Sequence, residues 1–370
     1  MHRSVNPSRR LIIGGLASAA ALPPLTANAS STSAEVWLDG GYGFDRALVA
    51  ENRFSAEAIE EAVRLSALTG HKALLVWHDG KLLLEHYGDG TDSSSLLPGF
   101  SMAKTVLGLM TGLAISKGLV SDLDAPVGRY IDEWQSDPRG EITLRHLMEM
   151  RSGLHLYSLA RQEPQAMAMV SGPHATATAL ETPLADTPGA SFRYANVNSQ
   201  ILGIAVSRAL ERSGTTYPAA LQDWLWQPLG LGRSRLELES ANGYPRFFAG
   251  LDARARDWLG LASVFLRDDI VPPQWLDQMA QASPHAPYGL HVWRGQAWAP
   301  RRHYGDPAGP SVPVLQPYRL DDMLVWDGAG GQRAYVSRGA GLVIIRMGQA
   351  SWEWEDSALP NHIIQQLGLG

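Results

Sequence analysis

The chain contains no cysteine, and only four of its 31 basic residues are lysines. Without cysteine it can form no disulfide framework, so its stability must come from a packed core. The formal net charge of -6 leaves no basic surplus for a nucleic-acid partner. A total of 370 residues, 45% of them hydrophobic, with 37 glycines, is typical of a compact globular protein and excludes a disordered, collagenous or coiled-coil chain.

The N-terminal segment lacks an apolar run of the roughly 20 residues that a membrane-spanning helix needs. It has a basic head ending in Arg9 and Arg10, an uncharged run over residues 11–22, and the small-x-small sequence that ends at Ala29. This pattern predicts a removable export signal over residues 1–29, and the arginine pair resembles a twin-arginine signal. A membrane anchor is the weaker alternative. We therefore expect a periplasmic or secreted protein with no stable membrane insertion after signal removal.

Strand-like runs lie near both ends of the remaining chain, and the middle is mostly helical. This layout predicts an α+β fold, in which an antiparallel sheet built from both termini is flanked by helices and interrupted by a mainly helical region over about residues 105–320. We expect an N-terminal extension over 30–50 and one domain over 51–370. The predicted strands are 73–77, 82–86, 333–336 and 341–347; the predicted helices are 102–116, 143–151, 196–212 and 218–226; and 156–189 and 282–317 are expected to be irregular loops that wall a site.

One of the four lysines, Lys104, follows Ser101 by three residues at the start of a predicted helix. That spacing puts both side chains on one face of the first turn, so the amine can reach the hydroxyl. Ser101 as a simple helix cap is the alternative. The helix beyond it is apolar around most of its circumference and should be buried, so a lysine at its head needs a partner or a purpose.

Two further motifs carry potential chemistry. Tyr194 and Asn196 precede another predicted helix, where a phenol and an amide can act on a nearby lysine and on a substrate; a half-buried aromatic and a helix cap would be the structural alternative. Trp326-Asp327-Gly328 is predicted to be a strand whose glycine allows a close approach to its backbone, or else part of a glycine-rich turn between strands.

In this order, the three motifs resemble those of the serine beta-lactamase and penicillin-binding protein superfamily, in particular its class C branch. There a Ser-x-x-Lys motif is followed by Tyr-x-Asn and by a Lys-Thr-Gly strand. The resemblance covers roughly residues 70 to 348, and it extends to the connecting segments 118–127, 142–154, 225–230 and 255–257.

The sequence departs from the lactamase pattern on the last strand. Trp326 stands where a lactamase has the lysine that holds the substrate carboxylate, and Asp327 would further disfavour an anion. This form of the last motif, Trp326-Asp327-Gly328, is similar to the motif of the branch that contains 6-aminohexanoate-dimer hydrolases and related carboxylesterases. Some amidases of that branch use a second tyrosine, for which Tyr157 is the candidate here. Trp326 would then offer an apolar wall to neutral substrates.

The resemblance implies the following roles. Ser101 is the nucleophile, Lys104 and Tyr194 move its proton, and Asn196 positions the lysine and the substrate. The backbone N–H groups of Ser101 and Ala329 form the oxyanion hole, and Gly328 keeps that strand close. No cofactor and no metal are expected, and His146 is interpreted as a buried or capping residue.

The leading interpretation is therefore a periplasmic serine hydrolase that acts on a small-molecule ester or amide through an acyl-enzyme. A beta-lactamase or DD-peptidase is the second, provided a cation such as Arg333 replaces the missing lysine. A non-catalytic binding protein is the third, against which the retained motif residues argue. A Ser-His-Asp hydrolase would need a Gly-x-Ser-x-Gly pentapeptide, and the sequence has none. Oligomeric state, acyl group and leaving group stay open.

Overall fold

The computed structural model describes residues 34–370, apart from 160, 242, 285–286, 306–308, 350 and 352. The predicted export signal over 1–29 lies outside these residues. The main sheet has seven strands and is antiparallel except for the pair β2 and β4, which is parallel. Its order is β2 (Val49–Ala50), β4 (Lys81–Tyr87), β3 (His71–His78), β13 (Leu342–Gly348), β12 (Gln332–Ser337), β11 (Leu324–Gly328) and β8 (Trp293–Arg294).

The predicted sheet from both termini is confirmed. Strand β3, from the first third of the chain, pairs with β13, from its end. The Asp79-Gly80 sequence forms the turn of the hairpin between β3 and β4. Both residues adopt positive φ, 47° and 79°, as a two-residue hairpin turn requires. The α+β expectation is therefore correct for the described residues.

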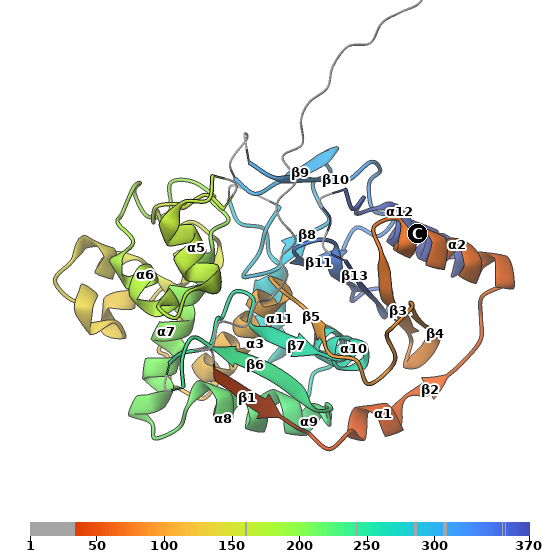
Figure 1. Cartoon of the computed structure of the whole chain (residues 1–370), viewed down its shortest axis with the longest axis horizontal. Coiled ribbons are helices and arrows are strands. Elements are labelled where there is room, and N and C mark those ends of the chain that lie inside the picture. The colour runs from red at the N-terminus through yellow and green to blue at the C-terminus, as the bar shows by residue number, and fades with distance from the viewer. Residues whose placement is uncertain are drawn as a thin grey trace, which may run out of the picture.

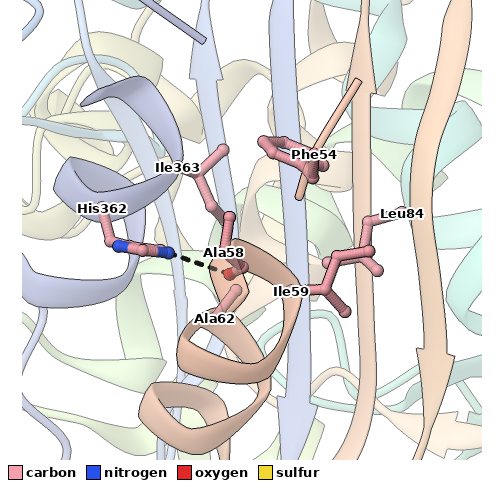
Figure 2. A pocket seen from close by; sticks show the side chains of 7 residues that line it. All are labelled: Phe54, Ala58, Ile59, Ala62, Leu84, His362 and Ile363. Carbon is pink, nitrogen blue, oxygen red and sulfur yellow. Dashed lines mark hydrogen bonds between the residues drawn. The ribbon is translucent and has the colours of Figure 1, made fainter. Parts of the chain in front are cut away.

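Helices cover both faces of this sheet (Figure 1). Alternate residues of β3 feed two separate cores, because successive strand side chains point to opposite faces. Leu74 and Val76 pack toward α2 (Ala56–Ala67) and α12 (Ala358–Gln366), whereas Ala73 and Leu75 face the opposite core, where α10 (Ala255–Ser263) packs on the sheet. A small pocket between α2, α12 and β4 is lined almost wholly by hydrocarbon, and its one imidazole, His362, donates to the carbonyl of Ala58 (Figure 2).

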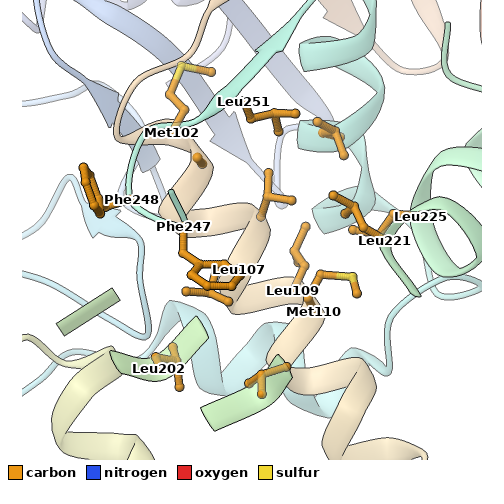
Figure 3. Close-up of a cluster of buried hydrophobic side chains, with 14 of the residues drawn as sticks. Met102, Leu107, Leu109, Met110, Leu202, Leu221, Leu225, Phe247, Phe248 and Leu251 are labelled. Atoms are coloured by element: carbon orange, nitrogen blue, oxygen red, sulfur yellow. The ribbon is translucent and has the colours of Figure 1, made fainter. Parts of the chain in front are cut away.

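The helix α3 (Met102–Ser116) lies in the centre of the larger core (Figure 3). Its residues from Met102 to Ala114 are all buried, including Lys104 and two threonines. It contacts α7 (Asn196–Arg212), α11 (Pro273–Ala280), β11 and β12. This central place fixes the N-terminus of α3 against the end of β11.

The inserted region also contains strands. A second sheet has the order β1 (Ala34–Leu38), β6 (Ser234–Leu238), β7 (Leu251–Ala253) and β5 (Leu97–Pro98), so residues 34–50 contribute strands to both sheets. The other strands and α-helices of the described residues are β9 (Arg301–His303), β10 (Ser311–Pro313), α1 (Gly43–Ala47), α4 (Leu144–Met148), α5 (Pro164–Ser171), α6 (Ala175–Glu181), α8 (Tyr217–Leu221) with a π turn over Gln222–Trp226, and α9 (Gln227–Leu229). Short 3-10 helices lie at Val127–Arg129, Asp132–Trp134, Pro138–Glu141 and Val264–Leu266.

The expectation of an irregular loop over 156–189 is wrong in part, because α5 and α6 lie within it. Pro164 occupies the first position of α5, where its missing N–H costs no hydrogen bond, and Gly172 ends that helix. The alanines and methionines between these two residues favour helix. In the described part of 282–317, which leaves out 285–286 and 306–308, the elements are the short strands β8, β9 and β10.

Candidate active site

Ser101 lies at the N-terminal end of α3, directly after a tight crossing of two chain segments. A Cβ atom added to Gly328 would come within 2.3 Å of the carbonyl oxygen of Gly99, so only glycine allows β11 to lie this close. Phe100 has a positive φ of 46°. The hydroxyl of Ser101 makes no hydrogen bond to the helix end, which argues against a role as helix cap, and is instead directed to Lys104.

The amine of Lys104 is surrounded by three acceptors. Its Nζ lies 2.8 Å from Ser101 Oγ, 3.0 Å from Asn196 Oδ1 and 3.0 Å from the carbonyl oxygen of Phe248. The residue is only 1% exposed. The Phe248 carbonyl can only accept hydrogen bonds, and so can Asn196 Oδ1. A neutral amine therefore donates its two protons to these two oxygens and presents its lone pair to Ser101.

The environment also favours the neutral amine. Burial lowers the pKa of Lys104 to about 7, and the nearby Asp327 carboxylate opposes that effect only in part. A substantial fraction of the amine is then unprotonated near neutral pH, as a proton acceptor for Ser101 requires.

Tyr194 lies beside the same amine, with Lys104 Nζ 5.0 Å from the centre of its ring. Burial and then the Asp327 carboxylate raise the pKa of the Tyr194 phenol above its usual value, and a hydrogen bond with Ser101 lowers it by less. The phenol thus keeps its proton at neutral pH and can pass a proton on, whereas the lysine is the group able to accept one.

The end of β11 leads into Ala329, whose backbone N–H the sequence resemblance assigns to the oxyanion hole together with that of Ser101. Gly328 ends the strand beside Gly99, and Ala329 follows it in a turn. Outside the strand ladders, neither the N–H of Ser101 nor that of Ala329 donates a hydrogen bond within the described part of the chain. These two N–H groups are the donors that the sequence resemblance assigns to a developing oxyanion.

Trp326 does not line a groove, contrary to the expectation from sequence. Its side chain is fully buried in the larger core, with its ring centre 6.0 Å from that of Phe265. The two-residue period of β11 turns Trp326 toward the core below the sheet and Asp327 toward the opposite face. Trp326 therefore cannot be the apolar wall for neutral substrates.

Arg333 is likewise not available to bind a substrate carboxylate. It is 1% exposed, and its guanidinium lies 2.6 Å from Asp327 Oδ1 and 2.5 Å from Asp356 Oδ1. Both of its carboxylate partners are themselves buried. The cation that the lactamase alternative would need is thus already paired inside the protein.

The two remaining predicted residues lie as follows. Tyr157 is half-buried in the segment before α5, with its ring 4.7 Å from that of His155. No contact joins it to Ser101 or Lys104 among the described residues, so its role stays a prediction. His146 forms a capping box with Thr143 at the start of α4, as the capping interpretation expected.

Two features of the site carried no sequence signal that we used. The Phe248 carbonyl is a backbone group that any residue would supply, so only the chain path identifies it. Tyr304 donates to Asp327 Oδ2 at 2.7 Å, and it comes from a segment that we expected to be irregular.

Within the described residues no group of three histidine, aspartate or glutamate side chains is arranged to hold a metal, and no helix is long and apolar enough to span a membrane.

This fold, with a serine and a lysine at the head of a buried helix and a strand end beside them, is that of the beta-lactamase-fold hydrolases. Residues 70–362 match the sequence model of the Beta-lactamase family, and the chain belongs to that family. The resemblance stated from the motifs is confirmed.

Solved structures of the same fold include three hydrolases. A candidate 6-aminohexanoate-dimer hydrolase from Bacillus anthracis is 19% identical over 90% of this chain and 88% of its own, with a TM-score of 0.65. A beta-lactamase from Mycobacterium bovis is 19% identical over 84% and 100%, with a TM-score of 0.61. EstCE1, a hydrolase with promiscuous acyltransferase activity, is 17% identical over 84% and 96%, with a TM-score of 0.60. At these identities the likeness shows the fold alone.

Proposed function

We propose that this protein is a serine hydrolase that cleaves an ester or amide bond through an acyl-enzyme on Ser101. One observation carries the proposal: the buried amine of Lys104, held by Asn196 and Phe248, lies 2.8 Å from Ser101 Oγ. Such an arrangement makes the hydroxyl a nucleophile without any metal or cofactor. Two structural neighbours, one named as a 6-aminohexanoate-dimer hydrolase and one as a hydrolase with promiscuous acyltransferase activity, support a hydrolase that forms an acyl-enzyme.

Acylation begins when Ser101 Oγ attacks the substrate carbonyl carbon. Its proton passes to the neutral amine of Lys104, and the N–H groups of Ser101 and Ala329 stabilise the oxyanion. The carbonyl re-forms as the bond to the leaving group breaks. The leaving alkoxide or amine takes a proton from the Lys104 ammonium, relayed through the Tyr194 phenol, which itself stays protonated.

Deacylation uses the same groups with water as the nucleophile. Water attacks the acyl carbonyl while Lys104, again with Tyr194, accepts its proton. The bond from Ser101 Oγ to the acyl carbon then breaks, and Ser101 regains a proton as the acid leaves. Asn196 holds the lysine amine in place throughout, because its Oδ1 accepts one of the amine protons.

The test is intact-mass analysis after incubation with p-nitrophenyl butyrate, penicillin G and a linear amide. We expect the wild type to gain the butyryl mass in rapid-quench samples, and the Ser101→Ala variant to gain nothing. Ser116→Ala is the matched control, because Ser116 is exposed at the other end of the same helix.

Tyr194→Phe should lower turnover by more than about tenfold, or 1.4 kcal/mol.

Absence of an acyl mass from the wild type, or its presence on the Ala variant, would contradict the nucleophile assignment. A stable adduct with penicillin G and none with the ester would favour the lactamase or DD-peptidase alternative. No adduct with any of the three, in a folded protein, would favour a non-catalytic binding protein.

We further propose that the protein works in the periplasm or outside the cell, delivered by the signal over residues 1–29. N-terminal sequencing of the exported protein should begin at Ser30. Replacing Arg9 and Arg10 by lysine should block export if the twin-arginine route is used, because its receptor reads the pair as an address. Recovery of an uncleaved chain from the cytoplasm would overturn this proposal.

A further inference from the structure

Behind the active site, four charged side chains form a closed cluster that we call the ion cluster: Arg302, Asp327, Arg333 and Asp356. Each arginine touches both carboxylates: Arg302 Nη2 lies 2.8 Å from Asp327 Oδ2 and also pairs with Asp356, while Arg333 contacts Asp327 Oδ1 at 2.6 Å and Asp356 Oδ1 at 2.5 Å. All four residues are at most 7% exposed. Two positive and two negative charges cancel, so the cluster as a whole is neutral.

Buried ion clusters of this kind add little stability, because removing the charges from water costs about as much as their attraction returns. Tyr304, Tyr318, Tyr335 and Trp354 also direct hydrogen bonds to the two carboxylates, so the cluster is rigidly held. Such a structure beside a candidate active site calls for a functional reason.

One contact links the cluster to the reaction site. Nη1 of Arg333 donates to the carbonyl oxygen of Gly328 at 2.8 Å, and also to the Gln332 carbonyl at 2.9 Å. The peptide bond after Gly328 joins that carbonyl to the N–H of Ala329. A trans peptide is planar, with its C=O and N–H pointing in opposite directions. A cation that holds the carbonyl therefore also fixes the direction of the Ala329 N–H.

The same contact affects the strength of the N–H as a donor. A charged donor at the carbonyl oxygen draws electron density through the conjugated peptide, and hydrogen bonds arranged in a chain strengthen one another. This effect is largest where water is excluded, as it is around Arg333.

We propose that Arg333, held by Asp327 and Asp356, is a positioning residue for the oxyanion hole, which it orients and polarises through the Gly328–Ala329 peptide. This inference rests on the proposed acyl-enzyme at Ser101. Arg302 provides the comparison within the protein, because it binds the same two carboxylates and makes no contact with the Gly328 carbonyl.

The experiment measures the carbonyl stretch of the acyl-enzyme by isotope-edited infrared difference spectroscopy. The probe is p-nitrophenyl trimethylacetate with ¹³C at the carbonyl, whose bulky acyl group is released slowly. Strong oxyanion-hole donors lower the stretching frequency. Arg333→Lys should therefore raise the frequency and lower kcat by at least about tenfold, whereas Arg302→Lys should leave the frequency at the wild-type value.

A matched pair of double variants covers the case in which the single variants fail to fold. Arg333→Met with Asp327→Asn, and Arg302→Met with Asp327→Asn, each leave one arginine and one aspartate, so the cluster stays neutral in both. Only the first loses the donor to the Gly328 carbonyl. We expect a raised frequency in the first double variant and a lower, wild-type-like one in the second.

The outcomes separate this inference from the proposed function. If the wild type forms no acyl-enzyme, the proposed function fails. If it forms one and the two members of a pair show the same carbonyl frequency, the function stands and the role of Arg333 is overturned. If Arg333 had a purely structural role, replacing it would lower the free energy of unfolding. The carbonyl stretching frequency would then be the same in the Arg333 variant and in its paired Arg302 variant.

Discussion

At the scale of single residues, Lys104 is a titratable group whose buried environment strongly changes its pKa. Its pKa of about 7 in the folded protein is well below the value of about 10.5 for an exposed lysine. Between these two values the unfolded chain binds more protons than the folded one, so stability rises with pH in this window. Below pH 7 the amine is protonated in both the folded and the unfolded chain, so the folded state bears the full free-energy cost of burying the charge.

We therefore predict that the stability of the wild type relative to a Lys104→Met variant increases by about 2 kcal/mol between pH 7 and pH 9. Urea unfolding at a series of pH values measures this difference. Lys117→Met, an exposed lysine at the end of the same helix, is the control and should show no such trend. A difference independent of pH would mean that the amine is not desolvated.

The same pKa predicts the pH dependence of the reaction. Only the neutral amine accepts the proton of Ser101, so kcat/KM for p-nitrophenyl butyrate should rise with pH through about 7 and then level off. A rise centred near pH 10 would show instead that a phenolate or an ordinary lysine controls the rate.

At the scale of elements, two histidines, His71 and His86, lie within hydrogen-bond distance of each other at the open end of the β3–β4 hairpin. His71 Nε2 lies 2.8 Å from His86 Nδ1, and its Nδ1 lies 2.8 Å from Ser66 Oγ at the end of α2. Burial, followed by the charge on His86, lowers the pKa of His71 to about 4. Between about 6.5 and 4 the unfolded chain binds more protons, so stability is lost as the pH falls through that range.

We predict that His71→Gln reduces the acid destabilisation of the protein between pH 6.5 and pH 4. Because the amide does not titrate, the slope of unfolding free energy against pH should become smaller in the variant. His303→Gln, at an exposed position on β9, should keep the wild-type slope. If the slope of unfolding free energy against pH were the same in both variants, protonation of His71 would not be the cause of the acid destabilisation.

At the scale of the whole molecule, the distribution of charge leads us to expect a preference for neutral substrates. The chain carries a formal net charge of -6, and the two buried arginines behind the site are neutralised by Asp327 and Asp356. Position 326, where the lactamase pattern has a substrate-binding lysine, carries a tryptophan that faces the core, and Arg333 is paired, so neither residue supplies a cation for a substrate carboxylate. A charge-assisted hydrogen bond of that kind contributes about 1.5 to 3 kcal/mol.

We accordingly predict that p-nitrophenyl butyrate has a kcat/KM at least about tenfold higher than its anionic analogue, the mono-p-nitrophenyl ester of succinic acid. The two acyl chains are of similar length and differ mainly in the terminal carboxylate. Nitrocefin should be slower than the neutral ester as well. A faster reaction with nitrocefin or with the anionic ester would favour the lactamase alternative.

The sequence by itself determined what depends on short separations along the chain. The three-residue spacing of Ser101 and Lys104 on one helical turn brings their side chains together in any fold, and the Asp79-Gly80 turn sets its hairpin in the same local way. The order of motifs was specific enough to predict the Beta-lactamase family and the α+β fold, both of which the match over residues 70–362 and the structure confirm.

Only the tertiary structure decided what depends on distant partners. Trp326 turned out to be buried and Arg333 paired, because the register of β11 and β12 sets which side of the sheet each side chain faces. The proton-accepting state of Lys104 likewise depends on the Phe248 carbonyl and on burial by segments more than 90 residues away. Solvation, strand register and long-range ion pairing are properties of the assembled core, and no local pattern in the sequence encodes them.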